Sequence, residues 1–196
     1  MIFFDTKPKR KNSWANGFGV KDKPCRKHIQ FVVGIDPGVE GALAVFKVTD
    51  DLPFKFVTLP FNGNALDSKA FFDILREYDA NVTLVVCENV IVKRGMKAQN
   101  MGTVGKNFGS LKTAVELFGA EFLALHPQTW QANFGLGRFK APEGKGSKEK
   151  ARMLFTMMFP TLVVNMTGPK GGWNHNIVDA ILIAYSSVRN LRMGAL

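Results

Sequence analysis

The amino-acid sequence predicts an α/β fold in which a mixed five-stranded sheet carries helices on both of its faces. Short apolar runs alternate with segments of helical periodicity in the order β-β-β-α-β-α-β-α-α. A glycine-containing turn joins the first two runs, which indicates a hairpin, and helices separate the later runs, which indicates parallel crossovers. A length of 196 residues with 46% hydrophobic residues suits one domain with a sizeable core.

Five segments are expected to be strands, because they are short, rich in β-branched or aromatic residues and bounded by turn-forming residues. The fourth is apolar almost throughout, which is typical of a strand that is covered on both faces in the parallel part of a sheet. The expected strands are residues 30–36, 41–48, 54–59, 82–87 and 121–125.

Five further segments have helical character, the third of them short. The second contains Gly105 and Gly109, which weaken a helix and indicate close packing against another backbone. A glycine-rich basic loop precedes the fourth. In the last, residues at helical spacing should face the core, namely Ile177, Ile181, Ala184 and Val188. The expected helices are residues 67–78, capped by Asp67 or Ser68, 104–118, 129–134, 147–159 and 173–191.

The positive charge is concentrated near the N-terminus. The formal net charge is +10, and residues 1–30 carry eight Lys or Arg against two Asp. We therefore expect residues 1–29 to form a flexible basic arm and residues 30–196 to form the folded domain. Such an arm suits a polyanion, because each neutralised phosphate releases counterions. A solvated extension that only keeps the protein soluble explains the same composition.

Cysteine usage and hydropathy exclude several classes of protein. Cys25 and Cys87 are the two cysteines, so we expect a reducing compartment and no disulfide framework. Cys25 and His28 have half of a zinc spacing, and the second half is missing. No apolar run approaches the ~20 residues of a membrane-spanning helix, and the N-terminal order of apolar and charged residues reverses that of a secretory signal. We expect a cytoplasmic protein without a membrane span.

Three carboxylates stand at positions that favour chemistry. Asp36 and Glu88 each come where an apolar run stops, and Asp179 lies on the last helix with His175 and Asn176 on the same helical face. An unpaired ionised carboxylate in an apolar setting is costly, so such groups normally pair with cations or bind metal. The structural alternative is that Asp36 caps a turn, Glu88 pairs with a lysine and Asp179 is solvated.

Oxygen ligands from separate elements suit Mg²⁺ or Mn²⁺ rather than zinc. Two such ions can activate a water and stabilise the leaving oxygen during hydrolysis of a phosphodiester. The acids therefore predict a metal-dependent nuclease if they lie together in the fold.

Four ordered blocks of sequence resemble the RuvC-type Holliday junction resolvases of the RNase H-like superfamily, and a phage-type member among them. The resemblance covers roughly residues 31–190. It implies an RNase H-like fold and a Mg²⁺-dependent endonuclease, with two ions per site and Mn²⁺ as a substitute, that resolves four-way DNA junctions as a homodimer. The blocks are GIDPG with GALAV (residues 34–38 and 41–45), VVCENV (85–90), SKEKA (147–151) and HNIVDAILIA (175–184).

Carried over by position, Asp36, Glu88 and Asp179 match the metal-binding acids of that family. Many members have a further acid or a histidine three or four residues before the last Asp, where this chain has Asn176 and His175. His175 is the better candidate for a catalytic residue and fourth metal ligand, since an imidazole can bind metal or carry a proton and an amide cannot titrate. A helix-start histidine bonded to the backbone is the structural alternative.

Contacts to DNA follow the family pattern less closely. Bacterial members have an aromatic residue three positions after the second acid, for stacking at the junction centre, and this chain has Ile91 there. Basic segments around residues 93–112 and 135–152 suit phosphate contacts, and ordinary solvated loops are the alternative. The candidate DNA-binding residues are Lys93, Arg94, Lys97, Lys106, Lys112, Arg138, Lys140, Lys145, Lys148 and Lys150.

The expected dimer interface is the helix over residues 104–118. Gly105 and Gly109 would permit close approach there, and Leu111, Val115 and Leu117 would supply apolar contact. The alternative is that these residues pack on the protein's own sheet. If the protein is phage-encoded, its cytoplasm is that of a bacterial host.

Other functions fit parts of the pattern. Another nuclease of the superfamily, such as an RNase H or a transposase-like protein, would need the same acids. A catalytically inactive junction-binding protein would not, because anionic side chains near DNA are unfavourable without a metal. Sugar kinases and actin-like ATPases begin with a similar strand, but they need a second, duplicated domain for which 196 residues leave no room.

Overall fold

The computed structural model describes residues 26, 28–38, 40–89, 98–138, 146–166 and 172–196. Its centre is a sheet in the order β3-β2-β1-β6-β7, and the predicted mixed five-stranded sheet is confirmed. β2 pairs antiparallel with β1 and β3, and β6 runs parallel to β1 and β7. The strands are β1 (Phe31–Asp36), β2 (Ala42–Lys47), β3 (Lys55–Thr58), β6 (Thr83–Glu88) and β7 (Glu121–Leu125).

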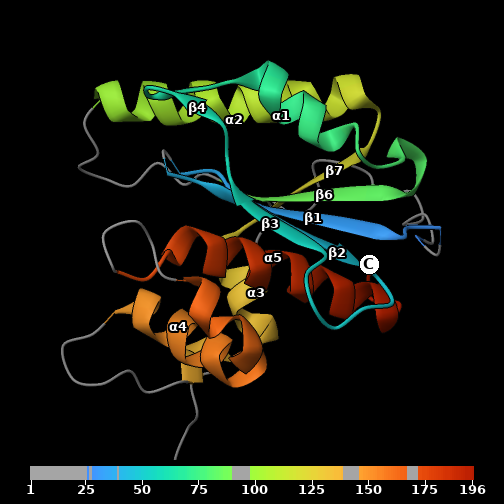
Figure 1. Ribbon diagram of the computed structural model, residues 1–196, viewed down its shortest axis with the longest axis vertical. Helices are drawn as coiled ribbons and strands as arrows, with labels where there is room; N and C mark the ends of the chain where they lie inside the picture. Colours follow the sequence, from blue (N-terminus) through green and yellow to red (C-terminus); the bar gives the residue numbers. More distant parts are fainter. Residues whose placement is uncertain (1–25, 27, 39, 90–97, 139–145, 167–171) are drawn as a thin grey trace, which may run out of the picture.

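Helices cover both faces of this sheet, as predicted. Figure 1 shows α1 and α2 on one face and α5 on the other, with α3 and α4 beyond α5. The sheet therefore separates two hydrophobic clusters, to which β1 contributes alternate side chains: Val32 to one and Val33 to the other. The helices are α1 (Ser68–Leu75), α2 (Ala98–Phe118), α3 (Pro127–Asn133), α4 (Ser147–Met158) and α5 (His175–Arg192).

Helix α5 is the element that organises the core. Its predicted core-facing residues are all buried, and buried residues lie on its other sides too, because it is enclosed between the sheet and α3 and α4. Asn174 caps the helix by accepting a hydrogen bond from the backbone N–H of Ile177 at 3.2 Å. The helix consequently begins at His175 rather than at the predicted residue 173.

Close backbone approach occurs at Gly34 of β1. A Cβ atom added to Gly34 would lie 2.5 Å from the backbone oxygen of Ala180 and 2.5 Å from the backbone nitrogen of Ala184, so α5 rests directly on β1. The corresponding expectation for Gly105 and Gly109 of α2 is wrong within this chain. No described atom lies within 4 Å of a Cβ built on either, and both lie on the exposed side of the helix.

A small hairpin was not predicted from the sequence. β4 (Phe61–Asn62) pairs with β5 (Ala65–Leu66), and Gly63 turns the chain with a φ of 59°. Buried Asn107 of α2 holds the hairpin, accepting from the N–H of Leu66 at 3.2 Å and donating to the carbonyl of Asn64 at 2.9 Å. Two-residue strands held by a distant helix leave no periodicity for a local prediction to find.

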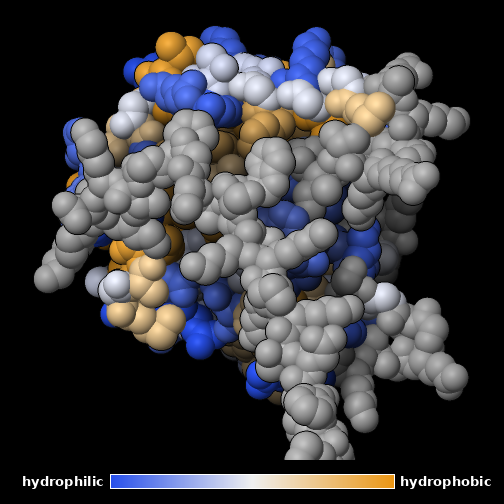
Figure 2. Space-filling model, turned by 180° about the vertical axis from the view of Figure 1, so that it is seen from behind, coloured by the Kyte–Doolittle hydropathy of each residue, from blue (hydrophilic) through white to orange (hydrophobic). Residues whose placement is uncertain are grey.

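The edge of the molecule formed by α1 and α2 has a mixed surface. Figure 2 shows apolar side chains among hydrophilic ones along its upper border, where these helices lie. Phe72 and Leu117 belong to this edge and line a groove of about 800 Å³ between the two helices.

Within the described ranges, no helix is long and apolar enough to cross a membrane.

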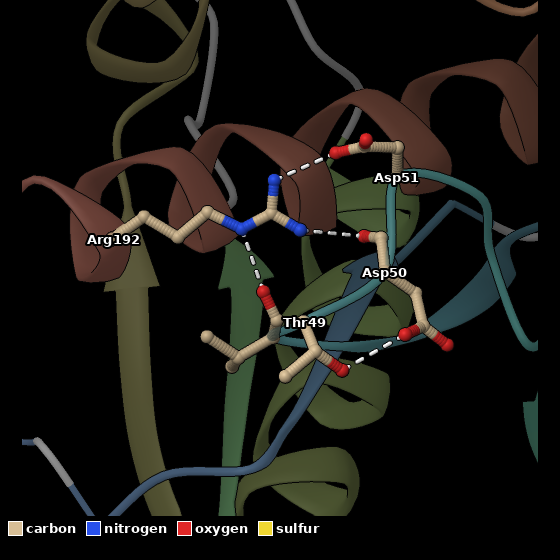
Figure 3. Close-up of polar contacts among 5 residues, drawn as sticks. Thr49, Asp50, Asp51 and Arg192 are labelled. Atoms are coloured by element: carbon tan, nitrogen blue, oxygen red, sulfur yellow. Dashed lines mark hydrogen bonds and ion pairs between the residues drawn. The ribbon is translucent and has the colours of Figure 1, made fainter.

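The C-terminal end of α5 is tied to the turn after β2. Arg192 donates to the backbone oxygens of Val48 at 2.6 Å and Asp50 at 2.8 Å, and it pairs with the carboxylate of Asp51 at 2.7 Å (Figure 3). One guanidinium thus satisfies three acceptors in one turn, because its donors lie in a fixed fork. This contact fixes the far end of the helix whose first turns carry His175 and Asp179.

Candidate metal and nucleic-acid site

Asp36 and Glu88 lie side by side because β1 and β6 are parallel neighbours. Ile35 pairs with Cys87 in the register of the two strands, so the next residue of each strand carries an acid at the same edge of the sheet. The backbone N–H of Gly38 donates to Oδ1 of Asp36 at 3.3 Å. Asp36 therefore caps the turn after β1, as the structural alternative to a metal ligand predicted. Its other oxygen, Oδ2, has no part in this hydrogen bond.

Asp179 joins the two strand acids through the contact between α5 and β1. Gly34 precedes Asp36 by two residues, and the backbone it touches belongs to Ala180, which directly follows Asp179. The close approach of strand and helix therefore brings the last acid to the end of β1. Three acids that are distant in sequence thus occupy one corner of the fold.

The pKa values of these acids report an environment that disfavours negative charge. Burial, and next the charge of Glu88, raise the pKa of Asp36 from 3.8 to about 6, against opposing effects of the Gly38 hydrogen bond and Lys148. Burial, and next the charges of Asp36 and Glu88, raise the pKa of Asp179 from 3.8 to about 8. The carboxylates therefore repel one another in a poorly solvated site, and a bound cation would relieve both effects.

A basic pocket opens beside Asp179. Its volume is about 360 Å³, and its walls come from α3, α4 and the chain that leads into α4, with Trp130, Lys148 and Lys150 among the lining residues. Lys148 also lowers the pKa of both Asp36 and Asp179, which places its positive charge near both acids. The pocket therefore offers an anion such as phosphate a counter-charge next to the carboxylate of Asp179.

Glu88 is held from the side of α3. The indole Nε1–H of Trp130 donates a hydrogen bond to Oε2 of Glu88 at 2.7 Å, and the Trp130 side chain is only 2% exposed. The sequence predicts the helix that carries Trp130 but does not single out this residue. The signal is not visible locally, because the contact depends on the pairing of β6 with β7.

His175 lies at the start of α5 near the cationic side of the site. Its Nδ1 is buried and has no hydrogen-bond partner among the residues that the structure describes. Burial, and next the charge of Lys148, lower the pKa of His175, with Arg152 adding to this effect and Glu149 opposing it. The ring therefore favours its neutral form, which is the form that can bind a metal.

Asn176 has a structural contact. Its Nδ2 donates to the backbone oxygen of Glu40 at 2.6 Å, which ties the start of α5 to the turn between β1 and β2. Its amide thus braces the loop that follows Asp36. Of the two residues preceding Asp179 on this face, His175 is the one with an unsatisfied nitrogen in the described part of the protein.

The ligand atoms of these residues suit a hard divalent cation, although the side chains do not converge on a single position for one. No three His, Cys, Asp or Glu side chains of the described residues are close enough to hold a metal ion together. The raised pKa values of Asp36 and Asp179 nevertheless show a demand for positive charge. The site therefore fits a cation in ligand type and charge, and side-chain adjustment would be needed to surround one.

The predicted DNA-binding residues fall into two separate groups. Lys148 and Lys150 line the pocket beside Asp179, and Arg138 is exposed on the short 3₁₀ helix Leu136–Arg138 that follows α3. Lys106 and Lys112 lie on α2, across the sheet, and Lys112 is 3.6 Å from Glu116. The remaining predicted residues lie outside the described residues, as do Ile91 and the N-terminal 25 residues: Lys93, Arg94, Lys97, Lys140 and Lys145.

The predicted dimer contacts of α2 need a correction. Leu111 and Val115 lie on the side of α2 that faces the sheet. They are fully buried in the chain's own core and cannot supply intermolecular contact. Leu117, in contrast, is 76% exposed and lines the groove between α1 and α2. Two of the three residues thus pack on the protein's own sheet, which was the alternative to a dimer contact.

Comparison with known proteins agrees with this architecture. No family model and no curated protein matches the sequence. The structure of Thermus thermophilus RuvC in complex with a Holliday junction substrate matches with a TM-score of 0.60 and 16% identity, over 85% of this chain and 97% of that chain. A second Thermus thermophilus RuvC structure matches with a TM-score of 0.57 and 19% identity, over 84% and 97%. The chain therefore has the fold of these RuvC structures.

Proposed function

We propose that this protein is a divalent-metal-dependent endonuclease that resolves four-way DNA junctions. The observation that carries the proposal is the convergence of Asp36, Glu88 and Asp179, from β1, β6 and α5, at one corner of the fold, beside a basic pocket that Asp179 lines. The fold supports it, since a RuvC of the same fold has been solved with a Holliday junction substrate.

Mg²⁺, with Mn²⁺ as a substitute, would be held by Asp36, Glu88 and Asp179, and His175 is the proposed fourth ligand. Two bound ions would supply an activated water and stabilisation of the leaving oxygen in an in-line displacement. The protein's own residues make this chemistry possible. The burial of Asp36 and Asp179 limits their solvation, and the negative charges of neighbouring acids raise their pKa values further, so a bound cation would stabilise their ionised forms.

Lys148 and Lys150 would bind the backbone of the strand to be cut. They line the pocket that Asp179 also lines, so a phosphate bound by their ammonium groups would lie next to the carboxylate of Asp179. Such contacts position DNA without reading its sequence. Arg138 would extend this surface, and Lys93, Arg94, Lys97, Lys140 and Lys145 remain proposed contacts. Lys106 and Lys112, on the other face, would contact a second arm of a branched substrate.

A homodimer is the proposed active form, and the cytoplasm is its proposed location. The alternatives are an RNase H or transposase-like nuclease and a junction-binding protein without catalysis. The fold itself is compatible with all of them. The partly buried acids with raised pKa values favour a nuclease, because a binding protein gains nothing from carboxylates in its DNA surface.

The deciding experiment offers the full chain four substrates with Mg²⁺: a four-way junction, a three-way branch, a linear duplex and an RNA–DNA hybrid. We expect cleavage of the four-way junction at paired positions, and none in EDTA. Preferred cutting of the hybrid would instead identify an RNase H. Junction binding without cutting in either Mg²⁺ or Mn²⁺ would overturn the catalytic proposal.

A further inference from the structure

We propose that Trp130 is a positioning residue whose indole N–H sets the orientation in which Glu88 presents its carboxylate to a divalent cation. This inference rests on the proposed function, because it concerns the same carboxylate site. The observation behind it is the 2.7 Å hydrogen bond from Nε1 of Trp130 to Oε2 of Glu88. The donor belongs to a side chain that is almost completely buried.

The chain builds this contact from the end of β7. Leu125 pairs with Glu88 in the parallel register of β6 and β7, so both strands end at the same level. His126 then caps α3, its Nδ1 accepting from the N–H of Gln128 at 3.2 Å. Trp130 follows one helical turn later. The first turn of α3 therefore places the indole of Trp130 next to Glu88, at the end of the neighbouring strand β6.

The chemistry of an indole suits this task. Its N–H can only donate a hydrogen bond, so Glu88 must be the acceptor. A hydrogen bond to an ionised carboxylate is among the stronger hydrogen bonds in proteins. It is also neutral. A lysine or arginine in its place would cancel the charge of Glu88 and compete with a cation, whereas Trp130 orients the carboxylate and leaves its charge in place.

The other side of the indole is anchored in the core. Trp130 belongs to the buried cluster that includes Leu136, Ala151 and Ile181, and its ring also forms part of the wall of the basic pocket. The ring therefore has little freedom, and its N–H direction is fixed by packing. Residues that orient a metal ligand in this way typically change metal affinity by roughly 10- to 100-fold when they are removed.

The first test observes the contact itself. The chain has three tryptophans, so a ¹⁵N–¹H spectrum of the full-length protein contains three indole signals, which single Trp→Phe variants assign. We expect Glu88→Gln to shift the Trp130 signal and to leave the Trp173 signal in place, because Trp130 donates to this carboxylate whereas Trp173 packs against Phe155 and Arg152. Adding Mg²⁺ to the wild type should move the Trp130 signal as well. A Trp130 signal unmoved by Glu88→Gln would overturn the proposal.

The second test measures Mg²⁺ affinity by calorimetry in Trp130→Phe, which retains an aromatic ring and loses the donor. We expect affinity to fall by roughly 10- to 100-fold. Trp173→Phe is the matched control, since Trp173 packs against Phe155 and Arg152 instead, and it should bind within about twofold of the wild type. If Trp130→Phe does not fold, the spectra of the wild type and Glu88→Gln carry the decision.

The outcomes separate this inference from the proposed function. A wild type that cuts junctions, together with a folded Trp130→Phe that binds Mg²⁺ equally well, would overturn the positioning role and leave the nuclease. A wild type that cuts no DNA, together with Mg²⁺ binding that depends on Trp130, would overturn the nuclease and support the positioning role.

Discussion

Asp36, Glu88 and Asp179 share a corner of the fold, but their surroundings differ. Asp36 accepts a hydrogen bond from a backbone N–H, and Glu88 accepts one from Trp130. The pKa of Asp179 is raised to about 8, because burial and the charges of Asp36 and Glu88 oppose its ionisation. Asp36 and Asp179 share an environment in which burial and neighbouring negative charges outweigh the positive charge of Lys148. This feature separates the proposed metal site from an ordinary buried ion-pair network.

We predict that Asp36→Asn, Glu88→Gln and Asp179→Asn each reduce Mg²⁺-dependent cleavage by at least about 100-fold and leave junction affinity within a few-fold. The acids would serve the metal, while affinity comes from lysines and arginines. Cleavage assays and gel-shift titrations on one junction measure both quantities. Lys148→Gln is the informative contrast, since it should weaken binding. Near-normal cutting by any two of the acid variants would remove the proposed site.

The raised pKa of Asp179 predicts how stability depends on pH without metal. The folded state holds the proton of the Asp179 carboxyl more tightly than the unfolded state does. Protonated Asp179 therefore contributes stability that is complete below pH 4 and is lost as the pH rises towards 8. Asp179→Asn removes the ionisation. The variant should therefore exceed the wild type in unfolding free energy by a few kcal/mol at pH 8, and by less at pH 5.

Urea unfolding in EDTA at the two pH values measures this difference. Adding Mg²⁺ should stabilise the wild type at pH 8 and have little effect on Asp179→Asn, because bound metal replaces the missing counter-charge. A variant that is no more stable than the wild type at pH 8 would contradict the unfavourable ionisation of Asp179.

At the scale of elements, the contact between β1 and α5 assembles the site. Gly34 lets the helix backbone rest on the strand, and this distance determines where Asp179 lies relative to Asp36. The sequence pattern located Asp36 and Glu88 at the ends of strands, and parallel pairing of β1 with β6 followed from the order of strands and helices. The helix-on-strand contact could not be predicted, because a glycine inside an apolar strand gives no indication of which partner approaches it.

The same limit explains the other departures from the sequence prediction. Gly105 and Gly109 have the pattern of close-packing residues, yet they lie on the exposed side of α2, and local spacing cannot distinguish the two situations. The contacts of Asn107 with the β4–β5 hairpin and of Trp130 with Glu88 join residues about 40 positions apart. Local periodicity determined most strands and helices, whereas contacts between elements determined the details of the site.

We predict that Gly34→Ala destabilises the fold by about 1–3 kcal/mol and impairs cleavage. The added methyl would lie 2.5 Å from backbone atoms of α5, so strand and helix must separate. Gly102→Ala is the matched control: no described atom lies within 4 Å of its new Cβ, and alanine in a helix should stabilise by about 0.5–1 kcal/mol. A Gly34→Ala protein as stable and active as the wild type would refute the role of this contact.

At the scale of the whole molecule, the first question is what the basic N-terminal residues, which we propose form an arm, do. Arg26 already pairs with Glu121 of β7, with its Nε donating at 2.6 Å, and Ile29 is buried, so a truncation should stop at residue 25. Residues 1–25 carry six Lys or Arg against two Asp. If they contact DNA, removing them must reduce the number of counterions released on binding.

We predict that deleting residues 1–25 leaves the thermal midpoint unchanged and weakens junction binding. The slope of log K against log salt should become shallower by about 0.9 for each phosphate that the protein no longer neutralises. A full-length variant with the six basic residues of the arm replaced by Gln separates charge from length and should match the deletion. Unchanged affinity and slope would make the arm a solubilising extension.

The second question at this scale is the oligomeric state, for which the α1–α2 edge is the candidate surface. A four-way junction has two equivalent strands to cut, and a two-fold symmetric dimer presents two sites at once. Leu117 is 76% exposed at the mouth of the groove that Phe72 and Gly109 also line. Gly109 leaves open space on this surface, so a second copy of α2 could approach closely.

We predict that the protein is a dimer at micromolar concentration and that Leu117→Asp makes it monomeric, because a charge in an apolar two-fold interface is introduced twice. Light scattering measures the mass with and without junction DNA. Met157→Asp is the control, since Met157 is 70% exposed on α4, away from this edge, and should leave the mass unchanged. The monomeric variant should release nicked junctions rather than paired cuts, because one site must then rebind to reach the second strand. A monomeric wild type under both conditions, with full paired cleavage, would rule out the dimer.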